Sequence, residues 1–244
     1  MNGIERAYVQ VEDASRPTVE ARALLRVLPT RGVEVTPFTS KRMRRRQLSI
    51  KRGTLVAGHL DVVTAAFAIL GVTGPALGSY PPSLAPLLGR RVWRSTLDAV
   101  LESGERVFVK PAEREKRFTG FVVGGTPGGF EAFGASRRLP VFCSEVVAFD
   151  SEHRAYVVHG EVRAVCRYAG VEADVPRGLL YDAIARLDAA GERVAGFAID
   201  VGLTADGRWL LVECNDGFGL GRYDGVSAED YTDLICARWR ERVA

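Results

Sequence analysis

The sequence has few of the residues that build disulfide frameworks, zinc sites or membrane spans. It contains four cysteines and three histidines in 244 residues. The cysteines lie more than 20 residues apart with no C-x-x-C pair, which fits neither a disulfide scaffold nor a zinc site. No run approaches the roughly 18–20 uncharged apolar residues of a membrane span. Residues 1–8 include Glu5 and lack the apolar run of a signal peptide. We therefore expect a cytoplasmic protein with reduced, buried thiols and no membrane partner.

The chain also lacks a strong net charge and, among its basic residues, it has little lysine. Thirty-three basic against 30 acidic side chains leave a formal charge of +3, too small to imply a polyanionic partner. Only Lys41, Lys51, Lys110 and Lys116 are lysines. In a chain this rich in arginine, a lysine indicates a position that suits a compact point charge.

Strand and helix patterns alternate over residues 1–78, whereas short strands dominate residues 79–244. The first part has predicted strands at 7–11, 33–38 and 54–58 and predicted helices at 18–31 and 60–70. The second part has predicted strands at 107–110, 121–123, 141–143, 156–158, 162–168, 194–201 and 209–214, and predicted helices at 96–103, 179–187 and 228–243. We expect an α/β unit with a parallel sheet, a boundary in the Pro/Gly-rich stretch 71–86, and then a mostly antiparallel α+β body.

Seven basic side chains crowd into residues 41–52. Such a run can be a patch for the phosphate backbone of RNA or DNA, or a solvated loop of an arginine-rich chain. No aromatic residue interleaves with the run to stack bases. We favour the solvated loop and keep nucleic acid as the alternative partner.

A predicted hairpin over residues 195–215 gives the strongest functional signal. Asp206-Gly207 between two apolar runs favours a two-residue turn, in which paired residue numbers sum to 413. Asp200 and Glu213 then lie directly opposite each other, and Asn215 lies on the same face. Apolar residues fill the other face: Phe197, Ile199, Val201, Leu203, Leu210, Val212 and Cys214.

Two opposed carboxylates repel each other unless a positive charge lies near them. A hard divalent ion relieves the repulsion, and Mg²⁺ is the usual choice when phosphates complete its octahedron. Alternatively, Asp200 and Glu213 each pair with an arginine. Because an amide adjoins the two carboxylates, we favour a metal site made by Asp200, Glu213 and Asn215.

The glycine-rich segment 216–223 follows the hairpin and carries Arg222, a candidate clamp for a carboxylate or phosphate. Lys110 ends a predicted strand, where it either binds an anion or extends to solvent from an edge strand. Lys116 lies in a loop that is suited to covering phosphates, or is only solvated.

Glu152 and Arg154 share one face of a predicted strand. They form either a surface ion pair or, beside a nucleotide, a pair in which Glu152 holds ribose hydroxyls and Arg154 a phosphate. Arg163 and Arg167 share a face of the following strand and can add positive charge.

In their order along the chain, these motifs resemble the ATP-grasp superfamily, and most closely its clade of small, compact domains. The resemblance covers roughly residues 90–225. It implies a two-lobed fold with largely antiparallel sheets gripping a nucleotide: a pre-ATP-grasp domain at 1–78 and an ATP-grasp domain at 79–244, with a small lobe at 90–145 and a large lobe at 146–244. The motifs are Phe108-Val-Lys110-Pro, Lys116 to Gly120, Ser144-Glu145-Val-Val147, Glu152-x-Arg154, Asp200, Glu213-x-Asn215-Asp216 and Gly221-x-Tyr223.

The resemblance also implies ATP and Mg²⁺ as cofactors and a role for each motif. Asp200, Glu213 and Asn215 would bind one or two Mg²⁺ ions. The backbone of Glu145, Val146 and Val147 would pair with the adenine edge. Nucleotide contacts would come from Lys110, Lys116, Glu152 and Arg167, and catalytic contacts from Arg154, Arg222 and Lys116.

The implied activity is a carboxylate–amine (or thiol) ligase that acts on small-molecule or peptide substrates through an acyl phosphate and releases ADP and phosphate. A phosphotransferase, or a nucleotide-binding module acting on an RNA or protein partner, are the alternatives. Two features depart from the family pattern: the loop 113–120 has one glycine, and the domain 1–78 is short. The substrates and the oligomeric state stay open.

Overall fold

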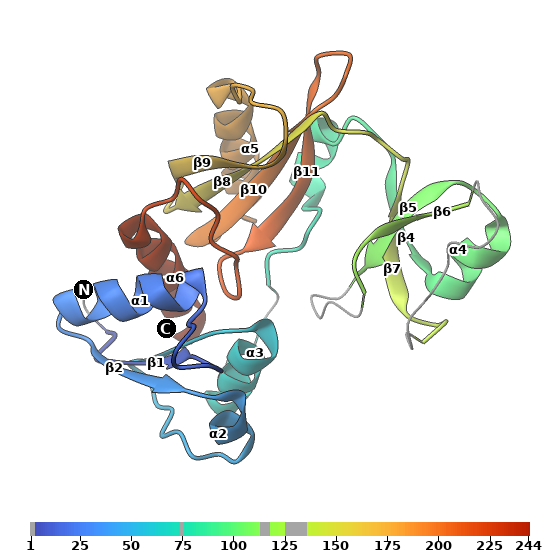
Figure 1. The fold of residues 1–244 in the computed structure, drawn as a ribbon. Coiled ribbons are helices and arrows are strands. Elements are labelled where there is room, and N and C mark those ends of the chain that lie inside the picture. Colours follow the sequence, from blue (N-terminus) through green and yellow to red (C-terminus); the bar gives the residue numbers. More distant parts are fainter. Residues whose placement is uncertain (1–2, 74–75, 113–117, 125–135) are drawn as a thin grey trace. The chain divides into compact units, whose positions relative to one another are not determined.

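A computed structural model of the chain describes residues 3–73, 76–112, 118–124 and 136–244, which fall into two compact units (Figure 1). One unit combines Met1–Leu87 with Asp150–Ala244, and the other is Leu88–Phe149. Across those four ranges, every helix is too short or too polar to span a bilayer. All four cysteines are buried and free of disulfides, which confirms the expectation of reduced, buried thiols.

A three-stranded parallel sheet in the order β2-β1-β3 opens the first unit, as the alternating pattern predicts. Pro37 lies in the edge strand β2, where its missing N–H costs no ladder hydrogen bond. Thr18 caps α1 by accepting a hydrogen bond from the Ala21 amide at 3.2 Å. The elements are β1 (Arg6–Gln10), α1 (Val19–Thr30), β2 (Glu34–Phe38), α2 (Ser40–Arg44), β3 (Thr54–Ala57) and α3 (Leu60–Ile69).

Helix α2 corrects one expectation. The basic run is not a loop throughout, because residues 40–44 form a helical turn that buries Met43 and exposes its arginines. A single apolar residue gives no periodicity from which this helix could be predicted.

An antiparallel sheet in the order β11-β10-β8-β9 forms the rest of the first unit. The long strand β8 lies in its middle and is buried along nearly its whole length. The elements of this part are η1 (Pro82–Leu87), β8 (Ser151–Val158), β9 (Glu161–Gly170), α5 (Arg177–Ala189), β10 (Gly196–Leu203), β11 (Trp209–Asp216) and α6 (Ala228–Val243).

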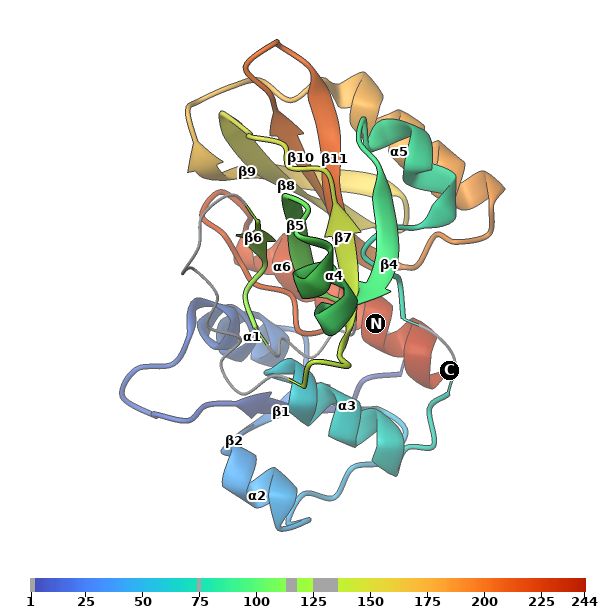
Figure 2. The ribbon, with the colours of Figure 1, turned by 90° about the vertical axis from the view of Figure 1, so that its right-hand side faces the viewer.

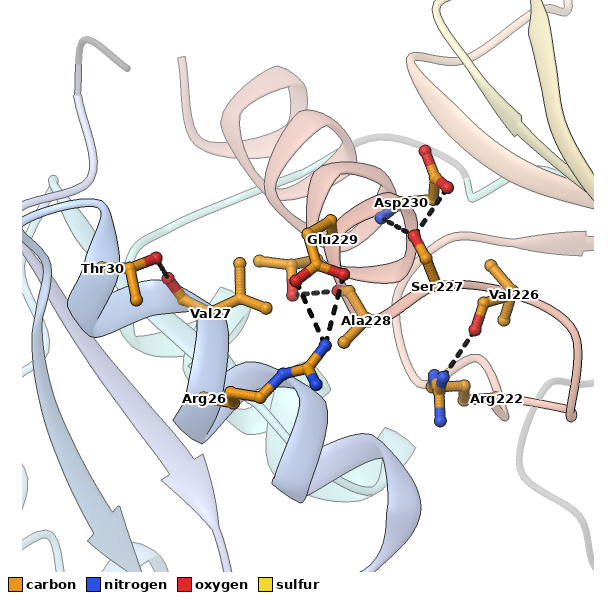
Figure 3. A network of polar contacts seen from close by, with 10 residues as sticks. Arg26, Val27, Thr30, Arg222, Val226, Ser227, Ala228, Glu229 and Asp230 are labelled. Atoms are coloured by element: carbon orange, nitrogen blue, oxygen red, sulfur yellow. Dashed lines mark hydrogen bonds and ion pairs between the residues drawn. The ribbon is translucent and has the colours of Figure 1, made fainter.

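The C-terminal helix α6 joins the two sheets of this unit into one core. Its Trp239 stacks on Phe67 of α3, with ring centroids 4.9 Å apart, and its Leu234 is fully buried in the same cluster as Ala198 of β10. At its surface, Arg26 of α1 binds Glu229 at 3.1 Å (Figure 3). The parallel sheet therefore shares its core with the antiparallel one.

The second unit is a four-stranded antiparallel sheet in the order β4-β7-β5-β6 with one helix (Figure 2). Alternate residues of β5 and β7 pack with α4 in a small core that includes Leu97, Val109 and Val141. Strand β4, like η1 in the first unit, was not predicted. The elements are β4 (Val92–Thr96), α4 (Leu97–Ser103), β5 (Val107–Pro111), β6 (Phe121–Val123) and β7 (Pro140–Ser144).

Candidate functional site

Strands β10 and β11 place Asp200 directly opposite Glu213, as predicted. The turn is not the predicted one. The Thr204 amide donates to the Arg208 carbonyl at 2.9 Å, so the turn holds three residues, with Gly207 at a φ of 81°. A β-bulge then adds Val212 to β11. These two one-residue differences cancel, which restores the predicted pairing of the carboxylates.

The bulge corrects the predicted apolar face. Leu211 lies opposite Val201, and Leu210 lies opposite Gly202. Leu211, only 1% exposed, therefore takes the place predicted for Val212 on the core side.

Five polar residues meet around this rung, and we call Glu152, Arg154, Asp200, Glu213 and Asn215 the carboxylate cluster. The amide nitrogen of Asn215 lies 3.1 Å from Asp200 Oδ2 and 3.1 Å from Glu213 Oε1. Arg154 lies opposite Asp200 on β8 and donates from Nε to Oδ1 at 2.7 Å and from Nη2 to Oδ2 at 2.6 Å. The predicted metal residues are thus together, and one carboxylate already has a guanidinium partner.

Burial and neighbouring charge set the protonation of this cluster. Burial raises the pKa of Asp200 to about 6; the hydrogen bonds and charge of Arg154 oppose the rise, and Glu213 and Glu152 add to it. Burial alone would lower the pKa of Arg154, but the hydrogen bonds and charge of Asp200 raise it above its ordinary value. The guanidinium therefore stays charged, while Asp200 titrates near neutral pH.

Two tyrosines that the sequence did not single out for this role flank the guanidinium. The rings of Tyr168 and Tyr223 stack at 5.1 Å, and Arg154 lies 4.9 Å from the Tyr223 ring and 5.9 Å from that of Tyr168. The Tyr168 hydroxyl donates to Glu152 at 2.9 Å. Only Tyr223 carried a signal, since it closes the Gly221-x-Tyr223 motif.

The glycine-rich segment is fixed to the sheet by Tyr156 of β8. Its buried hydroxyl donates to the Gly221 carbonyl at 3.0 Å and accepts from the Tyr223 amide at 2.9 Å. Burial raises the pKa of this hydroxyl to about 12, so it remains protonated and can donate. The segment is thereby held beside Arg154.

The donor set of the cluster fits Mg²⁺. Over the described ranges no three His, Cys, Asp or Glu side chains group as a metal site, so the set depends on the amide of Asn215. Rotating that amide by half a turn presents its oxygen where its nitrogen now lies. Asp200 accepts three of the roughly four hydrogen bonds that a carboxylate can accept, and one lone pair remains. Glu213 and Asn215 can therefore supply most of the protein oxygens, with Asp200 adding one.

Two predicted residues are not brought to the cluster. Arg167 lies opposite His153, on the other side of the sheet from Arg154, and it pairs with Glu172 at 3.0 Å. Arg222 donates through Nη2 to the Val226 carbonyl, next to the start of α6 (Figure 3).

The remaining predicted residues belong to the second unit. Lys110 is half-buried in β5, opposite Phe142 of β7. Glu145 follows β7, and its carboxylate accepts a hydrogen bond from the Arg91 amide at 2.8 Å. Val146 and Val147 are half-buried just beyond it. Lys116 lies outside the described residues.

A family model described as an ATP-grasp domain, the second family of its clade, matches residues 87–234 of this sequence, which is more than half of the chain. Comparison with curated proteins finds no match.

Solved structures of ATP-grasp enzymes share the fold at low sequence identity. The ATP-grasp ligase PsnB, complexed with precursor peptide PsnA2 and AMPPNP, is 13% identical over 98% of this chain and 99% of its own, with a TM-score of 0.54. Macrocyclase MdnC, bound with precursor peptide MdnA from Microcystis aeruginosa MRC, is 13% identical over 95% and 98%, with a TM-score of 0.55. D-alanine–D-alanine ligase from Bacillus anthracis, complexed with ATP, is 13% identical over 98% and 97%, with a TM-score of 0.58.

Proposed function

Since this chain belongs to the ATP-grasp superfamily, in the family whose domain model it matches, we propose that it is an ATP- and Mg²⁺-dependent ligase joining a carboxylate to an amine or thiol. The carboxylate cluster is the observation that carries the proposal. Two carboxylates and an amide converge beside a fixed, charged guanidinium. A triphosphate with its metal needs this combination of oxygen ligands and positive charge.

We assign the substrate carboxylate as the nucleophile of the first step. Its oxygen attacks the γ-phosphorus of ATP, the bond from that phosphorus to the β–γ bridging oxygen breaks, and ADP leaves. The amine or thiol then attacks the carbonyl carbon of the acyl phosphate, loses its proton and expels inorganic phosphate. Mg²⁺ bound by Glu213, Asn215 and Asp200 would neutralise charge on the triphosphate.

Arg154 is suited to hold the transferring phosphoryl group. Asp200 occupies its Nε and Nη2, and Nη1 has no hydrogen-bond partner among the described residues. The bidentate pair fixes the guanidinium plane, so that Nη1 can donate to a phosphate oxygen without reorganisation.

Further roles complete the proposal. Lys110 binds α- and β-phosphate oxygens, Glu145–Val147 bind adenine, and Glu152 binds ribose hydroxyls. We also propose residues 1–78 as a pre-ATP-grasp domain and 79–244 as the ATP-grasp domain. The free, buried thiols support a cytoplasmic location, and the precursor peptides bound to PsnB and MdnC support a peptide substrate.

ADP release tests the proposal. We expect a screen of carboxylic acids, amino acids and short peptides with Mg²⁺ and ATP to find ADP and phosphate only where an acid and an amine or thiol are both present. A stable phosphorylated product from one acceptor alone would identify a phosphotransferase instead. ATP binding without turnover in any combination would favour a binding module.

The titration of Asp200 gives a second test. We expect a midpoint near pH 6 in a ¹³C NMR titration of its carboxyl carbon, assigned with Asp200→Asn. Its folded pKa lies above the ordinary 3.8, so its contribution to the free energy of unfolding falls as the pH rises from 3.8 to about 6. Mg²⁺ with a non-hydrolysable ATP analogue should lower the midpoint, because a metal and a proton compete for the carboxylate. A midpoint that the metal does not move would contradict the assignment of Asp200 as a ligand.

A further inference from the structure

Helix α3 is apolar on two sides but buried on only one. Val63, Ala66 and Phe67 lie in the core of the unit. On another side, Ala68 and Ile69 are exposed, and Ile69 keeps 51% of its surface accessible. A helix that is apolar all round is normally covered all round. The open side of α3 is thus the kind of surface that another chain covers.

This open side forms one wall of a groove of about 640 Å³. Helix α2 and the segment after it form the other wall, and α2 and α3 lie at the same end of the parallel sheet (Figures 1 and 2). The α3 wall from Asp61 to Ile69 spans about 12 Å, close to two turns of a docked helix. Apolar side chains dominate the lining: Met43, Leu48, Val62, Ala65, Ala68 and Ile69.

The rim of the groove is basic and has no acidic partner of its own. Arg44 and Arg46 line the groove, and Lys41, Arg42 and Arg45 are exposed beside them. Over the described residues, none of these five forms an ion pair. Ten other arginines of the same unit do: Arg6, Arg26, Arg31, Arg154, Arg163, Arg167, Arg186, Arg193, Arg208 and Arg238.

The backbone at Arg46 is strained. Its φ is 54°, in the left-handed region that favours glycine, at the position following α2 where glycine usually ends a helix. An arginine kept there at a cost in stability indicates that its side chain serves something other than folding.

We propose that this groove docks an acidic amphipathic helix of a partner protein, with apolar side chains in the groove and carboxylates against the α2 arginines. Apolar anchors at helical spacing fit the α3 wall, and flanking carboxylates match the unpaired basic rim. The lining contains no aromatic residue on which bases could stack, so the groove favours a peptide over RNA. The surface shares no residue with the carboxylate cluster, and the proposal goes beyond the ligase activity.

Fluorescence anisotropy without nucleotide tests this proposal. The probe is a labelled helix-forming peptide of about 15 residues, with leucines at i, i+3, i+4 and i+7 and glutamates beside them. We expect saturable binding that Ile69→Glu and Arg44→Glu each weaken about 10-fold or more. Arg177→Glu, at an exposed arginine of α5, is the matched control and should bind like the wild type. Arg46→Gly should weaken binding and raise the Tm, because it removes a charge and relieves the backbone.

Several results would overturn the proposal. A scrambled peptide of the same composition that binds equally well would show unspecific charge attraction. An RNA oligonucleotide that binds in preference to the peptide would assign the rim to nucleic acid. A dimer that Ile69→Glu dissociates would show that a second copy covers the groove. None of these outcomes bears on ADP release, so failure here is distinguishable from failure of the ligase proposal.

Discussion

Replacing Glu213 with glutamine is expected to remove the Mg²⁺ dependence of ATP binding and to slow ligase turnover about 100-fold or more. Glutamine keeps the shape and one oxygen, but it loses the negative charge that attracts a divalent ion. Titration calorimetry with ATP, with and without Mg²⁺, measures the first effect. In the wild type, chelating the metal should weaken ATP binding strongly; in Glu213→Gln, it should change little.

Glu172→Gln is the matched control, because Glu172 pairs with Arg167 on the other side of the sheet from Arg154. It should retain both the metal dependence and the turnover. The Tm of Glu213→Gln should stay near that of the wild type, since half-buried Glu213 would lose repulsion from Asp200. If the Mg²⁺ dependence survives this substitution, the metal site lies elsewhere.

A second large effect is expected at Arg238 of α6. Its guanidinium donates from Nε and Nη2 to the two oxygens of Asp216, at 2.7 and 2.6 Å, and both side chains are buried. Asp216 also accepts a hydrogen bond from the Leu77 amide at 2.8 Å. Arg238→Met leaves a buried carboxylate without its countercharge, so the free energy of unfolding should fall by about 3–5 kcal/mol. Urea denaturation followed by circular dichroism measures it.

The exposed pair of Arg186 and Asp182, four residues apart on α5, is the matched control. Arg186→Met should cost less than about 1 kcal/mol. Removing both buried charges, with Arg238→Met and Asp216→Leu together, should recover part of the loss, because no unpaired ion is left inside. A single-variant loss as small as that of the control would contradict a stabilising role for the pair.

Local patterns predicted most helices and strands but not the details of the hairpin. The sequence carries the Asp206-Gly207 signal, yet Thr204 closes a three-residue turn through its backbone and its hydroxyl. The bulge at Val212 compensates. The Asp200–Glu213 pair was thus predicted correctly through two errors of one residue each. Neither error is visible locally, since bulges depend on how a strand packs in the whole sheet.

The partner of Asp200 could not be predicted for a different reason. Arg154 lies 46 residues away, and the two meet only because β8 pairs with β10. Period-2 alternation assigned Arg154 to a face but could not say which strand would lie beside it. The same limit applies to Tyr168, which reaches Glu152 across the β8–β9 pair.

The shared core around α6 has a consequence for biosynthesis. The ribosome makes the three parallel strands first and α6 last, yet Phe67 needs Trp239 and α1 packs against α6. The nascent N-terminal segment therefore emerges with part of its apolar surface uncovered and must wait for the end of translation to bury it. Chaperones that shield apolar surface would act during that interval.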